Sequence, residues 1–395
     1  MAGDGAAATQ EALDYDVGGV VRIRVRGGTA ADVALMTRLF GAPQAATGEA
    51  DLTVRFSPEL KVAGLRYLGL NSAAFTDEDF YLLGPKSGSI DARIPFDTLG
   101  HPSEIECRSG LGFVPHLFDA ISLVCIRKGF VALHGSAFVH DGVGILVLGW
   151  EKGGKTETLL AFANHGATYV GDEIVMLAGD GRTMFGIPVP ISIWDWNFDQ
   201  VPTLLAPLSL RKRLLRVVVS GLAAVRESHD RGRRRRTVAT RALDALITPL
   251  REKLRIWALP ARLFEGRVWP GAAPVDKVIL SVSHDQAEVT VSPCDPLEVA
   301  VRMRGSNERE RTRLLDHYRA FRFAFPNRRN ELLDSIDERQ GALLRQALSG
   351  KAAFLVRHPY PVRFEDLYRP IDALCGARRE LVANISVPAV AAVET

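Results

Sequence analysis

Hydrophobic and polar positions alternate with a period of two along much of the first 110 residues of the chain. The alternating runs cover residues 17–25, 51–56, 80–83, 89–94 and 104–107, with Gly, Pro or Asn clusters between them. Residues 29–40 instead have the spacing of an amphipathic helix. Because alternation is typical of strands that bury one face, the pattern predicts an N-terminal mixed α+β module, mostly antiparallel, over residues 1–115.

A different pattern begins after this module, where strand-like and helical runs follow one another. In order, the runs are helical 114–127, strand-like 130–138 and 142–148, and helical 155–164, 308–323 and 330–348. The stretch from Gly144 to Leu148 is continuously apolar, as in a strand that is buried on both faces. The order predicts an α/β domain over residues 116–395 that ends in a helical C-terminal part.

Positive charge is concentrated in one segment of that domain. The chain has a formal net charge of only +3, but residues 211–267 hold 16 Lys and Arg against 5 Asp and Glu, an excess of 11. We interpret residues 205–268 as a basic insertion. Its densest part, Arg231–Arg236, could attract an acidic partner, phosphates or nucleic acid, or it could be a solvated loop or helix end.

The continuously apolar run ends in a glycine-rich loop. Residues 149–156 (GWEKGGKT) fit the pattern G-x-x-x-x-G-K-[ST], with a strand-like run before and a helical run after it. In this pattern backbone N–H groups and the helix N-terminus cradle phosphates, the lysine reaches the β and γ oxygens, and the threonine hydroxyl binds magnesium. The residues predicted to bind ATP are therefore Gly149, Trp150, Glu151, Lys152, Gly153, Gly154, Lys155 and Thr156.

Two adjacent acids follow the next strand-like run. Residues 166–177 (GATYVGDEIVML) contain a short strand that ends in Asp172 and Glu173. A carboxylate at the end of a strand beside the loop can hold magnesium or its water, and a second can accept the proton of an attacking hydroxyl. The alternative is a surface turn with two solvated acids.

Three motifs together resemble the HPr kinase/phosphorylase group of the HPr kinase and phosphoenolpyruvate carboxykinase superfamily. They are Leu133-His134-Gly135-Ser136-Ala137, the loop at 149–156 followed by Glu157, and residues 166–173. The resemblance is detailed over residues 130–180, and it implies a P-loop core. Residues 275–280 then look like a further sheet strand, and 353–357 and 364–374 look like closing elements.

The resemblance also implies roles for individual residues. It puts Lys155 on the β and γ phosphates, Thr156 on magnesium, and His134 beside the acid pair. It also adds Glu157 to the residues that bind the cofactor, near the metal shell. On this basis the catalytic residues are Asp172, Glu173, His134 and Lys155, and the metal ligands are Thr156, Asp172 and Glu157. Similar proteins include kinases that phosphorylate a serine hydroxyl in HPr or in ribosomally made peptides. The related carboxykinases use the same nucleotide core for a different reaction.

The segment 186–197 contains two prolines that favour an extended path, on which Trp194 and Trp196 would share one face. These tryptophans could shape an acceptor pocket or pack onto the core.

The favoured function is transfer of the γ-phosphoryl group of ATP, with Mg²⁺, to a hydroxyl of a protein, peptide or small molecule. One alternative is carboxykinase-like chemistry on a small carboxylic acid, and another is a nucleotide-binding scaffold without turnover. The chain has 47% hydrophobic and 24% charged residues, four widely spaced cysteines and no apolar stretch of 18 residues. We therefore expect a cytoplasmic protein without a membrane segment, which could form oligomers.

Overall fold

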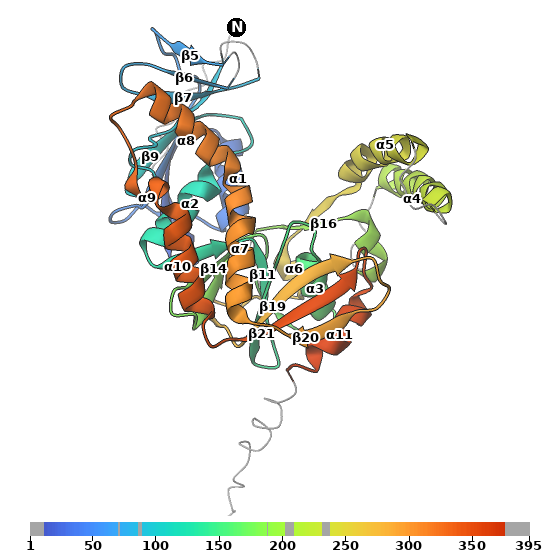
Figure 1. Cartoon of the computed structure of the whole chain (residues 1–395). Coiled ribbons are helices and arrows are strands. Elements are labelled where there is room, and N and C mark those ends of the chain that lie inside the picture. Colours follow the sequence, from blue (N-terminus) through green and yellow to red (C-terminus); the bar gives the residue numbers. More distant parts are fainter. Residues whose placement is uncertain are drawn as a thin grey trace, which may run out of the picture.

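The computed structural model describes residues 12–69, 72–85, 89–187, 189–201, 209–230 and 238–375. It is a mixed α/β structure with several sheets (Figure 1). None of the helices in these ranges is both long enough and apolar enough to span a membrane.

Nine strands form a mixed N-terminal sheet. In spatial order they are β3 (Gln44–Ala45), β1 (Leu13–Val17), β2 (Val21–Gly27), β4 (Leu52–Ser57), β9 (Ser103–Arg108), β8 (Ile90–Arg93), β7 (Phe80–Leu83), β6 (Ala73–Phe75) and β5 (Arg66–Leu68). Strands β2, β4 and β9 are parallel, and the other neighbouring strands are antiparallel. The alternating run expected at 17–25 includes the turn of the β1–β2 hairpin at Gly18-Gly19.

Helices from both ends of the chain complete the core of this sheet. They are α1 (Ala30–Phe40), α2 (Leu117–Arg127), α8 (Thr312–Ala324) and α9 (Glu331–Asp334). Phe321 of α8, for example, packs on Phe80 of β7 with 5.9 Å between ring centroids. The N-terminal sheet and the C-terminal helices therefore share one hydrophobic core.

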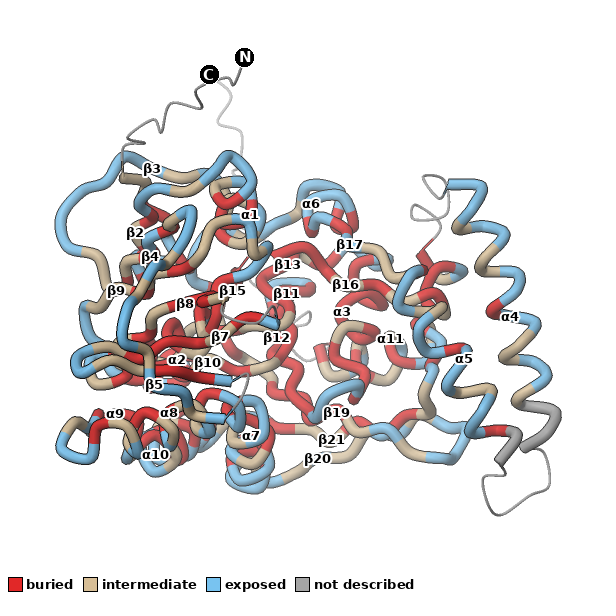
Figure 2. The backbone as a smooth tube through the Cα atoms, turned by 90° about the horizontal axis from the view of Figure 1, so that it is seen from above, coloured by how far each residue is buried: buried red, intermediate tan, exposed pale blue. Residues whose placement is uncertain are grey.

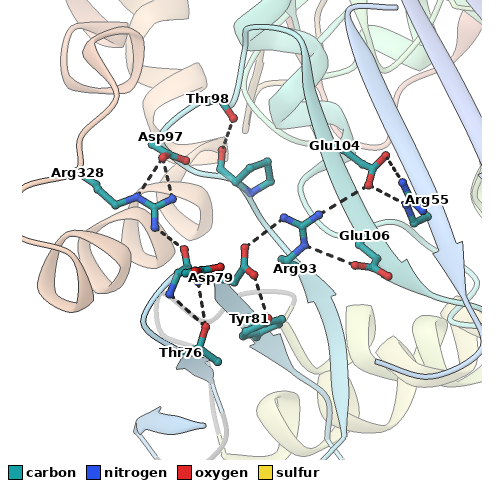
Figure 3. Close-up of polar contacts among 12 residues, drawn as sticks. Arg55, Thr76, Asp79, Tyr81, Arg93, Asp97, Thr98, Glu104, Glu106 and Arg328 are labelled. Carbon is teal, nitrogen blue, oxygen red and sulfur yellow. Dashed lines mark hydrogen bonds and ion pairs between the residues drawn. The ribbon is translucent and has the colours of Figure 1, made fainter. Parts of the chain in front are cut away.

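Ion pairs lie within the N-terminal part and between it and the segment that joins α8 to α9 (Figure 3). Arg93 on β8 lies 3.2 Å from Asp79 and 3.5 Å from Glu106. Arg328, between α8 and α9, lies 2.7 Å from Asp97. Because these side chains are partly exposed, each pair contributes only modestly to stability, and the apolar core carries the association.

A six-stranded sheet forms the centre of the second half. Its spatial order is β13 (Thr168–Gly171), β11 (Gly135–His140), β12 (Val143–Gly149), β19 (Lys277–His284), β21 (Ala352–Pro359) and β20 (Thr290–Pro293). Strands β12, β19 and β21 are parallel, so their carboxyl ends meet at one edge of the sheet. Every residue of β12 is buried, as the continuous apolar run predicted.

Helices cover both faces of this sheet. One face packs on α3 (Lys155–Ala163) and α11 (Phe364–Asp372), and the other on α7 (Pro296–Glu310) and α10 (Ile336–Leu348). Alternate residues of β12 point to opposite faces of the sheet: Val147 packs in the core with α3 and α11, and Leu148 packs in the core with α7 and α10. The arrangement agrees with a coarse α/β class.

The run expected as one strand at 130–138 is broken at His134. Residues before it form β10 (Phe130–Leu133), which pairs with β14 (Val175–Ala178) in a four-stranded sheet, whereas residues after it form β11. That smaller sheet is completed by β15 (Thr183–Gly186) and β18 (Ala273–Pro274). The hydrophobic pattern continues through the break, so it did not reveal that the chain changes sheets here. His134 lies at the junction of the two sheets.

Two helices project from the second half, α4 (Leu210–Asp230) and α5 (Val238–Leu254) (Figure 1). They fall within the expected basic insertion, and they are largely exposed apart from a seam around Val219 and Ile247 (Figure 2). The 3-10 helix η1 (Asp195–Gln200) lies at their base, where Asp199 pairs with Arg216 of α4 and Asp195 with Arg251 of α5. The ribbon of β16 (Ile191–Ile193) and β17 (Ile256–Ala258) flanks these segments in the chain, and helix α6 (Pro260–Leu263) follows β17. The cluster Arg231–Arg236 lies outside the described residues.

Asn330 provides a test of the shared core. It is 2% exposed, its Nδ2 donates to the carbonyls of Phe96 and Leu99 at 2.8 Å, and its Oδ1 accepts from the N–H groups of Leu332 and Leu333. We expect Asn330→Ala to lower the free energy of unfolding by about 2–4 kcal/mol, because buried polar groups lose their partners. Urea denaturation measures this.

The matched variant Asn330→Asp keeps the acceptor that caps α9 but loses both donors of the side chain. Its free energy of unfolding near neutral pH should therefore lie between those of the parent and Asn330→Ala. A loss below about 0.5 kcal/mol in the Ala variant would mean that the two segments are not coupled in this way.

Candidate functional site

The candidate site is built on the loop that joins β12 to α3. Gly154, which precedes α3, has a φ of 87°, and a Cβ at this position would lie 2.2 Å from Nε2 of His358. At Gly149, a Cβ would lie 2.5 Å from the carbonyl oxygen of Ser281. Space therefore requires both glycines, and Gly154 also needs the left-handed backbone that glycine adopts freely. A helix that begins directly after such a loop offers its first N–H groups to an anion.

Side chains from the two neighbouring parallel strands fix the loop. The hydroxyl of Ser281 on β19 donates to the carbonyl oxygen of Gly153 at 2.6 Å, and Nε2 of His358 on β21 lies 2.9 Å from the same oxygen. Both side chains are buried. Sequence reasoning missed both residues. The available signal was their position, directly after the strand-like runs 275–280 and 353–357.

Lys155 occupies the first position of α3 and is buried. Its Nζ donates to the carbonyl oxygens of Trp150 at 2.7 Å and Gly149 at 3.2 Å. Burial lowers the pKa of the Lys155 ammonium, while the charge of nearby Asp172 acts in the opposite direction. Neutral carbonyls compensate a buried cation only in part, so an anion brought to the loop would be stabilised here.

Strand β13 ends in a tight turn that gives its two acids different partners. The N–H of Ile174 donates to the carbonyl of Asp172 at 2.7 Å, and Glu173 between them has a φ of 66°. The hydroxyl of Thr156 donates to the Asp172 carboxylate at 3.2 Å, whereas Oε2 of Glu173 lies 3.3 Å from Nε2 of His134. Positive φ at a non-glycine residue costs about 1–3 kcal/mol, and such residues cluster at functional sites.

His134 has a carboxylate at each ring nitrogen. In addition to Glu173 at Nε2, Oε1 of Glu310 lies 2.5 Å from Nδ1. Glu310 is the last residue of α7, and no sequence pattern distinguished it from the many other charges of that helical region. The three side chains form one charged cluster beside the loop.

Asp172 is 2% exposed, and its carboxylate contacts the Thr156 hydroxyl at the start of α3. Burial raises the pKa of its carboxyl to about 8, and the charge of Glu173 adds to the shift. Lys155 and the Thr156 hydroxyl lower the pKa but do not offset burial. The Thr156 hydroxyl and the Asp172 carboxylate are oxygen ligands of the kind that Mg²⁺ prefers, and a bound dication would favour the ionised carboxylate.

Glu157, in the first turn of α3, is held by three donors from other segments. Its Oε1 accepts from Asn197 Nδ2 at 3.2 Å, from Tyr360 Oη at 3.3 Å and from Trp196 Nε1 at 3.5 Å. Trp196 in turn stacks on Trp194, with 5.0 Å between ring centroids. The tryptophan pair therefore belongs to the wall of the site, although the chain turns into η1 here rather than staying extended.

Two cavities adjoin at the cluster of His134 and Glu173. The loop cavity has a volume of about 230 Å³ and is lined by the loop together with Trp194, Asn197 and Tyr360. The side cavity has a volume of about 670 Å³ and lies among α1, α2, the end of α7 and the β16–β17 ribbon. Four residues line both cavities: His134, Glu173, Ser192 and Arg255.

Most residues selected from the sequence converge at the loop cavity. Its lining includes His134, Glu151, Lys152, Gly153, Gly154, Lys155, Thr156, Glu157 and Glu173. Asp172 lies behind this lining, where its carboxylate accepts a hydrogen bond from the Thr156 hydroxyl. Gly149 is the last residue of β12, the strand that leads into the loop. Trp150 is 52% exposed, with the guanidinium of Arg309 5.9 Å from its ring.

A second group of potential cation ligands lies at the other end of β11. Nε2 of His140 is 3.1 Å from Asp372 and 3.8 Å from Asp141. Gly135, at the opposite end of the strand, pairs with Leu148 next to the loop. This group is therefore not part of the loop site.

Asp172 makes a testable contribution to stability. Burial raises the pKa of the Asp172 carboxyl to about 8, so the folded protein keeps this proton up to that pH, whereas the unfolded chain loses it near the ordinary aspartate pKa of 3.8. The loss of folding stability caused by this carboxyl is therefore absent below pH 3.8, grows as the pH rises and reaches its full size above about pH 8. In metal-free buffer, the Tm of Asp172→Asn should exceed that of the parent only slightly at pH 5 and by several degrees at pH 9.

Thermal unfolding followed by circular dichroism measures the difference, with Asp285→Asn at an exposed position as the control. A Tm difference between Asp172→Asn and the parent that stays constant from pH 5 to 9 would contradict the assignment of Asp172 as a buried, proton-holding acid.

Comparison with known proteins adds no family assignment. No protein-family model matches the chain, and no curated protein matches it significantly. The loop, the acid pair and the two adjoining cavities are therefore the basis for assigning a function.

Proposed function

We propose that this protein is an ATP- and Mg²⁺-dependent phosphotransferase that transfers the γ-phosphoryl group to a hydroxyl. The observation that carries the proposal is the grouping of Lys155, Thr156 and Asp172 at the start of α3. A buried ammonium lies on the loop, and the threonine hydroxyl next to it contacts a buried carboxylate at 3.2 Å. Phosphoryl transfer needs a cation on the phosphates, a metal site and a positioned base.

In this proposal, the loop N–H groups and Lys155 hold the β and γ phosphates. Thr156 and Asp172 would hold Mg²⁺, which would supply positive charge to neutralise the phosphates. Glu157, fixed by Asn197, Tyr360 and Trp196, keeps the tryptophan-bearing segment against the nucleotide site. The grouping of these parts supports a P-loop core of the HPr kinase type, as the motif resemblance suggested.

Glu173 is the better placed of the two acids to serve as base, because it lines the side cavity as well as the loop cavity. It accepts the proton of the acceptor hydroxyl while the acceptor oxygen bonds to the γ phosphorus. The bond from that phosphorus to the bridging oxygen breaks, and its electron pair leaves with ADP. His134 orients Glu173 and is itself held by Glu310.

The first test replaces the two central charges separately. Lys155→Ala should reduce ATP turnover by about 10²-fold or more, because the β and γ phosphates lose their counter-charge. Asp172→Asn should reduce Mg²⁺-dependent transfer by a similar factor, while affinity for a fluorescent ATP analogue changes by less than about tenfold. Asp180→Asn, at an exposed turn, is the control.

Unchanged turnover in both variants would refute the assignment of the loop. Nucleotide binding without turnover in the parent, with any acceptor, would favour the scaffold alternative. ATP use that depends on carboxylation of a small acid would favour the carboxykinase alternative.

A further inference from the structure

The side cavity has the size and lining of a small-ligand site. Its volume of about 670 Å³ lies within the usual range of such sites, and much of its wall is apolar. The apolar members of the lining are Leu39, Phe118, Ile174, Val189, Pro190 and Trp257. Phe118 and Trp257 are 39% and 58% exposed, so the cavity presents aromatic surface to an incoming molecule.

Three polar side chains of the lining are available to a ligand. Oγ of Ser192 is buried and has no hydrogen-bond partner within the described residues, and Ser192 lines both cavities. Arg38 is exposed at the rim and forms no ion pair in the part of the chain that the structure describes. Among the carboxylates that the structure describes, the guanidinium of Arg255 has only a long ion-pair contact, to Glu252 at 3.9 Å. It lies over Trp194 and Trp257, at 5.4 and 4.7 Å from their ring centroids.

The two carboxylates of the cavity, by contrast, already contact His134, which leaves Glu173 as the proposed base but not as an anion-binding group. Glu173 and Glu310 flank the ring of His134, so the groups left for a ligand are cationic or hydroxylic. A ligand that matches this lining has an apolar body and an anionic group. Because the ligand would lie next to Glu173, the proposed base, it also needs a hydroxyl that faces the loop cavity.

We propose that the side cavity is the acceptor site and that its acceptor is amphipathic, with an apolar body, a carboxylate or similar anion, and one hydroxyl. The apolar body lies against Phe118 and Trp257, the anion meets Arg38, and the hydroxyl lies between Glu173 and the γ phosphate. This inference rests on the proposed function, since ATP supplies the phosphoryl group. Arg255, which lines both cavities, is positioned to meet the charge that develops during transfer.

The binding test uses anilinonaphthalene sulfonate, a fluorescent probe with an apolar aromatic body and one anionic group. We expect the Phe118→Ala/Trp257→Ala double variant to weaken binding of the probe at least about tenfold, and Arg38→Gln to weaken it severalfold. Tyr67→Ala removes an equally exposed aromatic ring from β5 and is the matched control. Affinity for the Mg²⁺ complex of the ATP analogue should stay within about twofold of the parent in all variants, because none of these residues lines the loop cavity.

The transfer test compares phenyllactate, a serine-containing peptide of apolar residues, and glycerol as acceptors. Phosphorylation of phenyllactate identifies a free small molecule as the source of this chemistry, and phosphorylation of the peptide identifies a chain segment. In either case kcat/KM for the acceptor should fall in the double variant and not in Tyr67→Ala.

Equal binding of the probe by the parent and the double variant would overturn the proposal. Phosphorylation of glycerol alone, at a rate that the double variant does not change, would also overturn it while leaving the phosphotransferase assignment intact. Absence of ATP turnover in the parent would instead refute the proposed function, and the probe titration would still decide whether the side cavity binds an amphipathic anion.

Discussion

The geometry of the site depends on the carbonyl group of Gly153. A glycine-containing loop can keep an anion-sized concavity only if its backbone is fixed, and here Ser281 and His358 contact the same carbonyl oxygen. Both side chains come from strands parallel to β12, so the sheet itself sets the position of the loop. The close approach of His358 also explains why Gly154 cannot carry a side chain.

Once the loop is fixed, two opposite charges are buried beside it. Lys155 and Asp172 are both shifted toward their neutral forms, because burial outweighs their mutual attraction. Phosphate oxygens would stabilise the ammonium, and a divalent cation would stabilise the carboxylate. The cost of burying these two charges is thus only partly offset within the protein, and a metal-bound nucleotide would offset more of it.

Local patterns were sufficient to find the centre of the site. The glycine-rich loop and the acids Asp172 and Glu173 each follow a recognisable strand-like run, so these residues could be selected from short segments. The coarse α/β class and the buried strand β12 followed from hydrophobic patterning in the same way.

The rest of the site depends on contacts between distant segments, which no local pattern encodes. Glu310 meets His134 only because α7 ends beside the junction of two sheets. The helix expected at 308–323 is likewise divided at Arg311, whose buried guanidinium binds Asp337 and Gln340. Helical spacing continues through that break, so the sequence alone could not locate it.

The central claim is that the loop, Thr156 and Asp172 form one site for a nucleotide and its metal. Electron paramagnetic resonance of Mn²⁺, used in place of Mg²⁺, measures this directly in the 395-residue chain near pH 8.5. We predict that about one Mn²⁺ binds per chain when ATP is present and that little binds without ATP, since the phosphates supply part of the coordination shell. Mn²⁺ binding that is the same with and without ATP, or absent in both cases, would contradict the account.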